Sequence, residues 1–326
     1  MRATVLFGLA LAVATVAWAE EARAPQDLGT GIHLLPGGSY PDRGPDGNTT
    51  VIDAPEGLIV VDTGRHVWHS DGILHFAAAA KRPIVAIFNT HWHLDHSSGN
   101  GRLKAAFPGA RVYTTNAVDR ALAPGGFLAR DLELVKGLLE KPEFSETRKD
   151  DFRLFIATMG EQDVLRPDVV LSSSGPMTVA GKALDVHVTD KAVTDADVWL
   201  YDRQSGIAVI GDLVTMPVPY FETACPGRWS AALDEVWQTP FKLAIPGHGD
   251  PMSREQFNTY RTTFQSFVAC VRSDKAVQQC GEVWTNGIVP LMGDKPGAKE
   301  KLQRGGEYYT KMLRENGGKS KDCLAE

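Results

Sequence analysis

The chain has 326 residues, of which 43% are hydrophobic, and its formal net charge is −6 with acidic and basic residues interspersed. This length suits one large α/β domain. No stripe of Lys and Arg with interleaved aromatic residues occurs, so nucleic-acid binding is not expected.

The N-terminal segment 1–19 has the pattern of a secretory signal peptide. Arg2 supplies a positive charge, the apolar run 3–16 is too short to cross a bilayer, and Ala17-Trp18-Ala19 fits a small-x-small cleavage site. We expect cleavage after Ala19, a periplasmic or secreted protein, and no membrane association after cleavage. Residues 20–31 are expected to form a polar, poorly ordered lead-in.

Short β-rich runs alternate with helical patterns in the first half of the chain. Strands are predicted at 32–35, 49–52, 57–61, 84–88 and 111–114, and helices at 70–81 and 101–107. Residues 116–162 are mostly helical with a break at Pro124-Gly125-Gly126. This stretch is longer than a connection requires, so we expect it to overhang a cleft.

The second half contains further strands followed by a helical C-terminal part. The predicted strands are 169–172, 177–179, 184–188, 198–202, 207–211 and 242–245, and the predicted helices are 229–239, 253–271 and 297–316. Residues 246–249 read as a tight turn because they contain two glycines and a proline.

The run Thr90-His91-Trp92-His93-Leu94-Asp95-His96 follows the strand predicted at 84–88. Ligands and catalytic groups collect at the carboxyl ends of strands in α/β sheets. His91 and His93, two residues apart, can point to one position, while Asp95 and His96 point to a neighbouring one. Imidazole and carboxylate ligands suit zinc best, with iron or manganese as alternatives. The run therefore predicts a metal site.

All four cysteines lie in the last third of the chain. An even number is compatible with disulfides in an exported protein. We expect the near neighbours Cys270 and Cys280 to pair, which leaves Cys225 and Cys323 either as a second pair or as free thiols. Cysteine is not expected to bind metal, because no CxxC spacing occurs.

Four motifs occur in order: Asp62-Thr63-Gly64, the histidine-rich run, Gly211-Asp212 and Pro246-Gly247-His248-Gly249. Together they resemble the metallo-β-lactamase superfamily over residues 32–252. The resemblance implies an α/β fold, a four-layered αβ/βα sandwich with metals at the edge between its two sheets. Residues 32–252 would be the catalytic domain, 116–162 a helical insertion, and 253–326 a helical extension packed on the same domain.

The resemblance also assigns metal ligands to two positions. The first would be held by His91 and His93, the second by Asp95, His96 and His248, with Asp212 bridging both. Asp62 would hold a ligand or a loop by hydrogen bonds, or serve only as a turn residue after its strand.

The family usually supplies a third histidine to the first position, and Val193 stands there in this sequence. Valine cannot coordinate, whereas the second position keeps all its groups. Zinc at catalytic sites takes about three protein ligands and a water. We therefore expect one or two zinc ions per chain, with the second position favoured. His187 or His66 could substitute, although each is expected to be an ordinary sheet or loop histidine.

These features predict an exported zinc-dependent hydrolase acting on a small molecule. Metal-bound hydroxide would attack the carbonyl of an ester, lactone or amide, with a β-lactam among the candidates. Asp95 would be the catalytic residue that orients the water and takes its proton. Tyr220 and Phe221 could form an aromatic wall over the metals, and Phe127 and Leu128 a lid.

Three other interpretations remain at this point. An oxygen-using iron enzyme of the same fold is disfavoured, because its relatives use the histidine that Val193 replaces. A degenerate, non-catalytic periplasmic metal-binding or sensing protein is favoured by Val193 and disfavoured by the complete second position. An accessory protein of a periplasmic quinoprotein dehydrogenase system is the third.

Overall fold

The computed structural model describes residues 23–293 and 296–323. The predicted signal peptide and its cleavage site lie outside these residues. Within them, no helix is both long and apolar enough to cross a membrane. The strands are β1 (Gln26–Asp27), β2 (Ile32–Leu35), β3 (Thr49–Ala54), β4 (Gly57–Val61), β5 (Ile84–Phe88), β6 (Arg111–Thr114), β7 (Val169–Val170), β8 (Gly175–Val179), β9 (Lys182–Asp190), β10 (Ala196–Asp202), β11 (Ile207–Thr215), β12 (Leu243–His248) and β13 (Met252–Ser253).

Helices flank the sheets and make up most of the C-terminal part. They are α1 (Val67–Ala80), α2 (Leu94–Ser97), α3 (Asn100–Ala106), α4 (Ala117–Leu122), α5 (Phe127–Leu139), α6 (Glu146–Gly160), a 3₁₀ turn (Gln162–Leu165), α7 (Pro226–Gln238), α8 (Arg254–Val271), α9 (Val277–Met292) and α10 (Ala298–Glu315).

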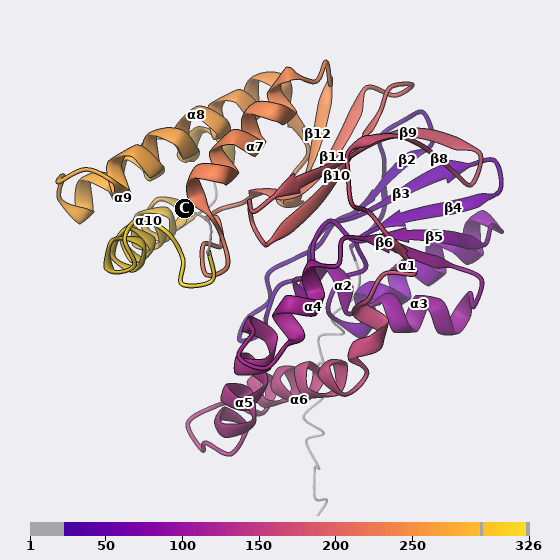
Figure 1. Cartoon of the computed structure of the whole chain (residues 1–326), viewed down its shortest axis with the longest axis horizontal. Helices are drawn as coiled ribbons and strands as arrows, with labels where there is room; N and C mark the ends of the chain where they lie inside the picture. The colour runs from indigo at the N-terminus through magenta and orange to yellow at the C-terminus, as the bar shows by residue number, and fades with distance from the viewer. Residues whose placement is uncertain (1–22, 294–295, 324–326) are drawn as a thin grey trace, which may run out of the picture.

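Two sheets pack face to face (Figure 1). The first has seven strands in the order β1-β2-β3-β4-β5-β6-β7, and the second has six in the order β13-β12-β11-β10-β9-β8. β4 and β5 run parallel, as do β11 and β12. The motifs that follow these strands therefore meet at one edge of the sandwich, which is where α/β sheets place ligands.

The apolar strands supply both faces of each sheet, and this produces the layers. In β4, Ile59 and Val61 point into the core between the sheets, whereas Leu58 and Val60 pack under α1 and α3. The outer face of the second sheet is covered by α7, α8 and α9 through a cluster that contains Trp229. A run buried on both faces is typical of a strand between two layers. The predicted αβ/βα sandwich is confirmed.

The C-terminal helices pack on the second sheet, and two disulfides join segments of this part of the chain to one another. Cys270–Cys280 joins the end of α8 to α9, as predicted, and Cys225–Cys323 joins the chain's last described residue to the start of α7. α8 begins with a capping box formed by Ser253 and Gln256.

Three local predictions were wrong. Residues 246–248 extend β12 rather than forming a turn, because Asn48 Nδ2 donates hydrogen bonds to the backbone oxygens of Pro246 and Gly249. Gln26–Asp27 pairs with β2, so the lead-in is ordered there. Helix α9 was not predicted, since its glycines and Pro290 suggest breaks. Two of these glycines allow close helix packing, because a Cβ on Gly281 or Gly287 would collide with α10 or α8.

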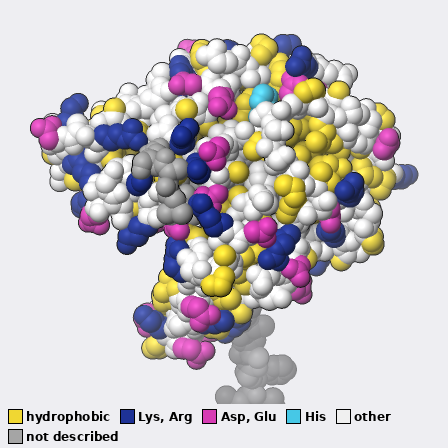
Figure 2. Space-filling view, in the orientation of Figure 1, with side chains coloured by type: hydrophobic (Ala, Val, Ile, Leu, Met, Phe, Trp, Pro, Cys, Tyr) yellow, Lys and Arg dark blue, Asp and Glu magenta, His cyan; other side chains and the backbone are white. Residues whose placement is uncertain are grey.

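Figure 2 shows one face of the molecule, on which acidic and basic side chains are interspersed. No large area of one sign of charge is visible on this face. The distribution agrees with the interspersed charges of the sequence.

Candidate metal centre

The six residues predicted as metal ligands converge at the edge between the sheets. His91 and His93 lie in the loop after β5, Asp95 and His96 lie in α2, Asp212 lies in β11, and His248 ends β12. Their ligating atoms form two groups, one of His91, His93 and Asp212 and one of Asp95, His96 and His248. Within each group these atoms lie within 4.8 Å of one another.

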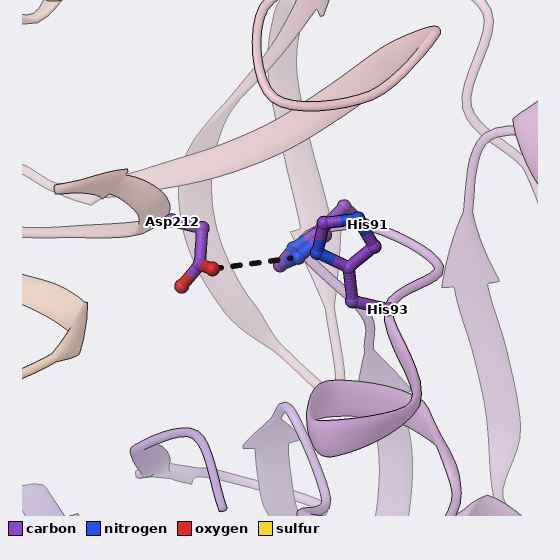
Figure 3. Close-up of side chains that lie close together, drawn as sticks. All are labelled: His91, His93 and Asp212. Carbon is purple, nitrogen blue, oxygen red and sulfur yellow. Dashed lines mark ion pairs between the residues drawn. The ribbon is translucent and has the colours of Figure 1, made fainter. Parts of the chain in front are cut away.

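Asp212 connects the two groups. Its Oδ2 lies 3.8 Å from His91 Nε2, and its Oδ1 lies 3.2 Å from His96 Nε2 and 3.6 Å from His248 Nε2. Figure 3 shows its carboxylate directed at the two imidazoles of the first group. One carboxylate thus reaches both groups, as the family resemblance predicts.

Hydrogen bonds fix which nitrogen of each imidazole is free in the first group. Thr90 Oγ1 donates to Asp62 Oδ2, so it accepts from Nδ1–H of His91 at 3.0 Å. Thr223 Oγ1 donates to the backbone oxygen of Val193, so it accepts from Nε2–H of His93 at 3.0 Å. The lone pairs that remain are on His91 Nε2 and His93 Nδ1.

Asp62 orients an imidazole of the second group in the same way. Its Oδ2 accepts from His96 Nδ1–H at 2.8 Å, so Nε2 is the nitrogen of His96 that faces His248 and Asp212. Asp62 Oδ1 also accepts from the Thr90 backbone N–H at 2.8 Å. Asp62 therefore orients both an imidazole and the loop that carries the histidines.

Two buried atoms of the centre have no hydrogen-bond partner among the described residues: His91 Nε2 and Asp212 Oδ1. Leaving buried polar atoms unpaired costs about 1–3 kcal/mol each. Inward-facing imidazole lone pairs next to a carboxylate are the donor set of a zinc, iron or manganese site. The residues present therefore fit a metal ion.

The pKa values of the first group agree with this interpretation, whereas those of His96 and His248 are raised, because Asp212 and Asp95 outweigh the effect of burial. These two imidazoles would release a proton when a metal ion binds. Burial lowers the pKa of His93 to about 4 and that of His91 well below its ordinary value, so both are neutral. Burial opposes ionisation of Asp95, but His96 and His248 hold its pKa well below the usual range. Neutral imidazole and ionised carboxylate are the forms that bind metal.

Close backbone approach shapes the centre. A Cβ on Gly247 would lie 1.9 Å from Asp212 Oδ1, and a Cβ on Gly47 would lie 2.4 Å from Cε1 of His96. Only glycine fits at these two positions, because any side chain would displace a predicted ligand.

The first group has no third histidine among the described residues. The Val193 side chain belongs to the apolar cluster on the outer face of the second sheet. His187 stacks on Trp199 with ring centroids 3.6 Å apart. Both ring nitrogens of His66 face carboxylates, those of Asp46 and Asp151. Neither histidine joins a metal-binding group, as expected for sheet and loop histidines.

A cavity of about 310 Å³ opens over the centre and is lined by Asp95, Asp212 and His248. The insertion overhangs it, since Phe127 and Leu128 of α5 and Phe155 of α6 line its wall. Tyr220 also lines the cavity, whereas Phe221 is fully buried against Trp229 and Phe264, so the aromatic wall predicted for it is wrong. Glu222 accepts a hydrogen bond from Tyr308.

Three polar residues around the centre were not predicted: Thr223, Arg65 and Asp131. Thr223 orients His93, and Arg65 and Asp131 line the cavity. They lie on separate elements and belong to no motif, so only the tertiary structure reveals them.

Comparisons with known proteins place the chain in a family. The family model described as the metallo-beta-lactamase superfamily matches residues 42–248. A linear primary-alkylsulfatase from a Pseudomonas species is 27% identical over 297 residues, which cover 85% of this chain and 54% of that protein. A hydroxyacylglutathione hydrolase from a Synechococcus species is 45% identical over 56 residues, 17% of this chain and 22% of that protein.

The fold extends beyond the matched family region. The solved structure of a stereoselective inverting sec-alkylsulfatase from a Pseudomonas species superposes with a TM-score of 0.58 at 16% identity, and the match covers 90% of this chain and 50% of that one. The chain thus spans about half the length of the alkylsulfatases it matches. Because the family model covers most of both sheets and all six predicted ligands, the chain belongs to the metallo-β-lactamase superfamily.

Proposed function

We propose that this protein is an exported, zinc-dependent hydrolase that cleaves esters of small molecules. Zinc would be held at the second position by Asp95, His96 and His248 with Asp212, and a further zinc would bind more weakly at His91 and His93. Two observations support this role above others. His91 Nε2 and Asp212 Oδ1 are buried without partners among the described residues, and Asp212 lines a cavity that opens to solvent.

The residues around the site have separable tasks. Zinc, when bound, supplies an acidified water and a positive charge that polarises the scissile group. Asp95 is the proposed catalytic residue, which orients the attacking water and takes its proton at Oδ2. This oxygen lies 3.0 Å from His248 Nε2, so the two proposed ligands face one position. Asp62, Thr90 and Thr223 keep the imidazoles in position.

The cavity fits a small or narrow substrate. The volume of about 310 Å³ over the centre adjoins a second cavity of about 400 Å³, and the two share Ser39, Met216, Pro217 and His248. We infer that the scissile bond lies near His248 and that the two ends of the substrate extend into the two cavities. A carboxylic ester, lactone or amide is the first candidate. A sulfate ester is the second, since the longest match is to an alkylsulfatase.

The proposed export rests on the segment 1–19 and on the disulfides. All four cysteines are paired, and disulfides persist in oxidising compartments such as the periplasm. The test is mass determination of the mature protein after expression with its own N-terminus, which should begin at Glu20.

Replacing Asp95 tests the hydrolase proposal. Wild-type protein loaded with zinc should hydrolyse at least one member of a panel of esters, lactones, β-lactams and aryl sulfates. Asp95→Asn should lower kcat/KM by about 10²-fold or more, because it removes the proton acceptor. Asp202→Asn, which alters an equally buried carboxylate at the far end of β10, should keep its activity.

The competing interpretation gives a different result. A non-catalytic metal-binding protein would bind zinc but turn over no member of the panel. Zinc binding without turnover would therefore refute the hydrolase proposal, and turnover that Asp95→Asn leaves unchanged would refute the role of Asp95.

A further inference from the structure

We propose that Arg65 recognises a negatively charged group of the substrate in the cavity over the candidate metal centre. This inference rests on the proposed function, because it assigns the substrate class of the same site. Among the described residues that line the cavity, Arg65 is the one Lys or Arg. Arg65 directly follows the Asp62-Thr63-Gly64 turn, in which Asp62 orients His96. The same turn therefore places a positive charge at the cavity wall.

The guanidinium of Arg65 has bonding capacity to spare. It forms one long ion pair, 3.7 Å from Nη1 to Asp151 Oδ2. The oxygens of Asp151 are already engaged, since Oδ1 accepts from His66 Nε2 at 2.9 Å and Oδ2 accepts from the Gly44 backbone N–H at 2.8 Å. Nε of Arg65 is buried without a hydrogen-bond partner among the described residues. A guanidinium offers five donors, and its planar fork matches two oxygens of one anion.

The side chain is also held in place before any ligand arrives. The Arg65 backbone N–H donates to Asp46 Oδ1 at 2.6 Å, and only 22% of the side chain is exposed. Gly44 packs directly against the guanidinium, because a Cβ there would lie 2.7 Å from Nη1. A group that is fixed in advance loses less conformational entropy when it binds.

An acidic residue, Asp131 of α5, lines the same cavity. Its removal should therefore affect anion binding in the direction opposite to removal of Arg65. Burial raises the pKa of Asp131 to about 6, and the charge of Arg130 and, to a smaller extent, that of Arg65 act against this increase. At neutral pH Asp131 is therefore mostly ionised, and an anion in the cavity is attracted by Arg65 and repelled by Asp131. Removing either charge should change the affinity for anions in opposite directions.

Two kinds of substrate carry such an anion. In a sulfate ester the charged group is the one that is cleaved, whereas in a carboxylic ester the charge is a free carboxylate elsewhere in the molecule. Both present two or more oxygens to a guanidinium, so Arg65 can bind either. The experiment distinguishes them.

The test compares three substrates with one leaving group: p-nitrophenyl sulfate, mono-p-nitrophenyl glutarate and neutral p-nitrophenyl butyrate. For whichever anionic substrate the zinc-loaded protein hydrolyses, Arg65→Met should raise KM about 10-fold or more, and Arg65→Lys should raise it less, because lysine keeps the charge but not the fork. Asp131→Asn should lower that KM. The KM for the butyrate should stay within about 3-fold in all three variants.

A matched control excludes a general effect of losing a half-buried arginine. Arg261 is 17% exposed and pairs with Asp234 away from the cavity, so Arg261→Met should leave every KM unchanged. Binding of octane-1-sulfonate and octanoate, measured by calorimetry, gives a readout that does not need turnover. Arg65→Met should weaken the binding of at least one of them about 10-fold.

The outcomes separate this inference from the proposed function. If esters are hydrolysed but Arg65→Met and Arg65→Lys leave the KM of anionic substrates and the sulfonate affinity unchanged, the role of Arg65 is overturned and the hydrolase proposal stands. If no ester is hydrolysed but anion binding still requires Arg65, the recognition role is supported and the hydrolase proposal fails.

Discussion

Replacing Asp151 with alanine should destabilise the protein, because Asp151 holds the insertion to the sandwich. The two ring nitrogens of His66 lie 3.0 Å from Asp46 Oδ2 and 2.9 Å from Asp151 Oδ1. Carboxylates accept hydrogen bonds, so both nitrogens donate and His66 is an imidazolium. Its side chain is 1% exposed and that of Asp151 is 4% exposed, so the cluster lies out of water.

The magnitude follows from what Asp151→Ala leaves behind. His66 keeps one carboxylate and loses the other, and the Gly44 N–H loses its acceptor. Removing one partner of a buried ion pair costs roughly 3–5 kcal/mol, and we expect about 3 kcal/mol because Asp46 remains. Only Asp151 and Met159 of α6 are buried, while Phe155 packs on an apolar cluster and Arg148 pairs with Asp42, so the helix stays attached in the variant and the loss remains limited. The expected decrease in Tm is roughly 5–10 °C.

The loss should depend on pH. Burial disfavours the charged imidazole, but the hydrogen bonds to Asp151 and Asp46 raise the pKa of His66 above its ordinary 6.5. Its contribution to stability is therefore complete below pH 6.5 and disappears as the pH rises through the folded-state pKa. Asp151 has a lowered pKa, so its contribution is present above 3.8 and disappears in acid. The difference between wild type and variant should be largest between about pH 4 and pH 6.5.

Thermal unfolding followed by circular dichroism at pH 5.5 and pH 9 measures this difference. Asp150→Ala is the control, since Asp150 is the exposed neighbour of Asp151 on α6 and pairs only with Arg153. Amide hydrogen exchange should increase in α6 of Asp151→Ala. An equal Tm for the two variants at pH 5.5, or a difference that grows toward pH 9, would show that His66 is not a buried cation shared by two carboxylates.

The remaining predictions concern the metal centre, in addition to those made for Asp95 and Arg65. Mass spectrometry of metal content should find about one tightly bound zinc per chain in the wild type, and Val193→His should leave it at about one, because the side chain at this position lies in the apolar cluster on the outer face of the second sheet. Two tight zinc ions in the wild type would show that the first group is complete without a third histidine, and two in Val193→His alone would show that the side chain at position 193 reaches that group. Thr223→Val should weaken zinc binding at the first group by roughly 10–100-fold while circular dichroism stays unchanged, because His93 loses the acceptor that fixes its tautomer. Equal zinc affinity in Thr223→Val and Thr285→Val, whose hydroxyl is buried within α9, would contradict this role of Thr223.

Most strands of the sandwich could be predicted from local sequence, although β1 and β13 were missed and β11 and β12 extend beyond their predicted ends. Runs such as 57–61 and 84–88 are continuously apolar, and their observed bounds are the predicted ones. A continuous apolar run of this length is typical of a strand whose two faces are both covered by other layers. Helix α9 was missed because Gly281, Gly287 and Pro290 suppress the local helix signal. The two glycines allow close contact with the neighbouring helices α10 and α8, and this contact cannot be predicted from local sequence.

The six predicted ligands could also be identified from the sequence, whereas the residues that surround and orient them could not. His91, His93, Asp95 and His96 form one short motif, while Asp212 lies in β11 and His248 ends β12. A motif of this kind is local, and strand direction brings distant motifs together by a general rule. The same reasoning does not predict Thr223 or Arg65 at the site, because neither belongs to a motif with a characteristic spacing.

The sequence by itself thus determined the family, the two sheets and the six residues that meet at their edge. The tertiary structure alone decided which nitrogen of each histidine is free, that His66 and His187 are committed elsewhere, and that Arg65 and Asp131 line the cavity. The physical reason is that candidate ligands can be recognised from residue type and from the order of the strands. Tautomers and unpaired charges depend on hydrogen-bond partners far away in the sequence, such as Thr223, 130 residues from His93, and Asp151, 85 residues from His66.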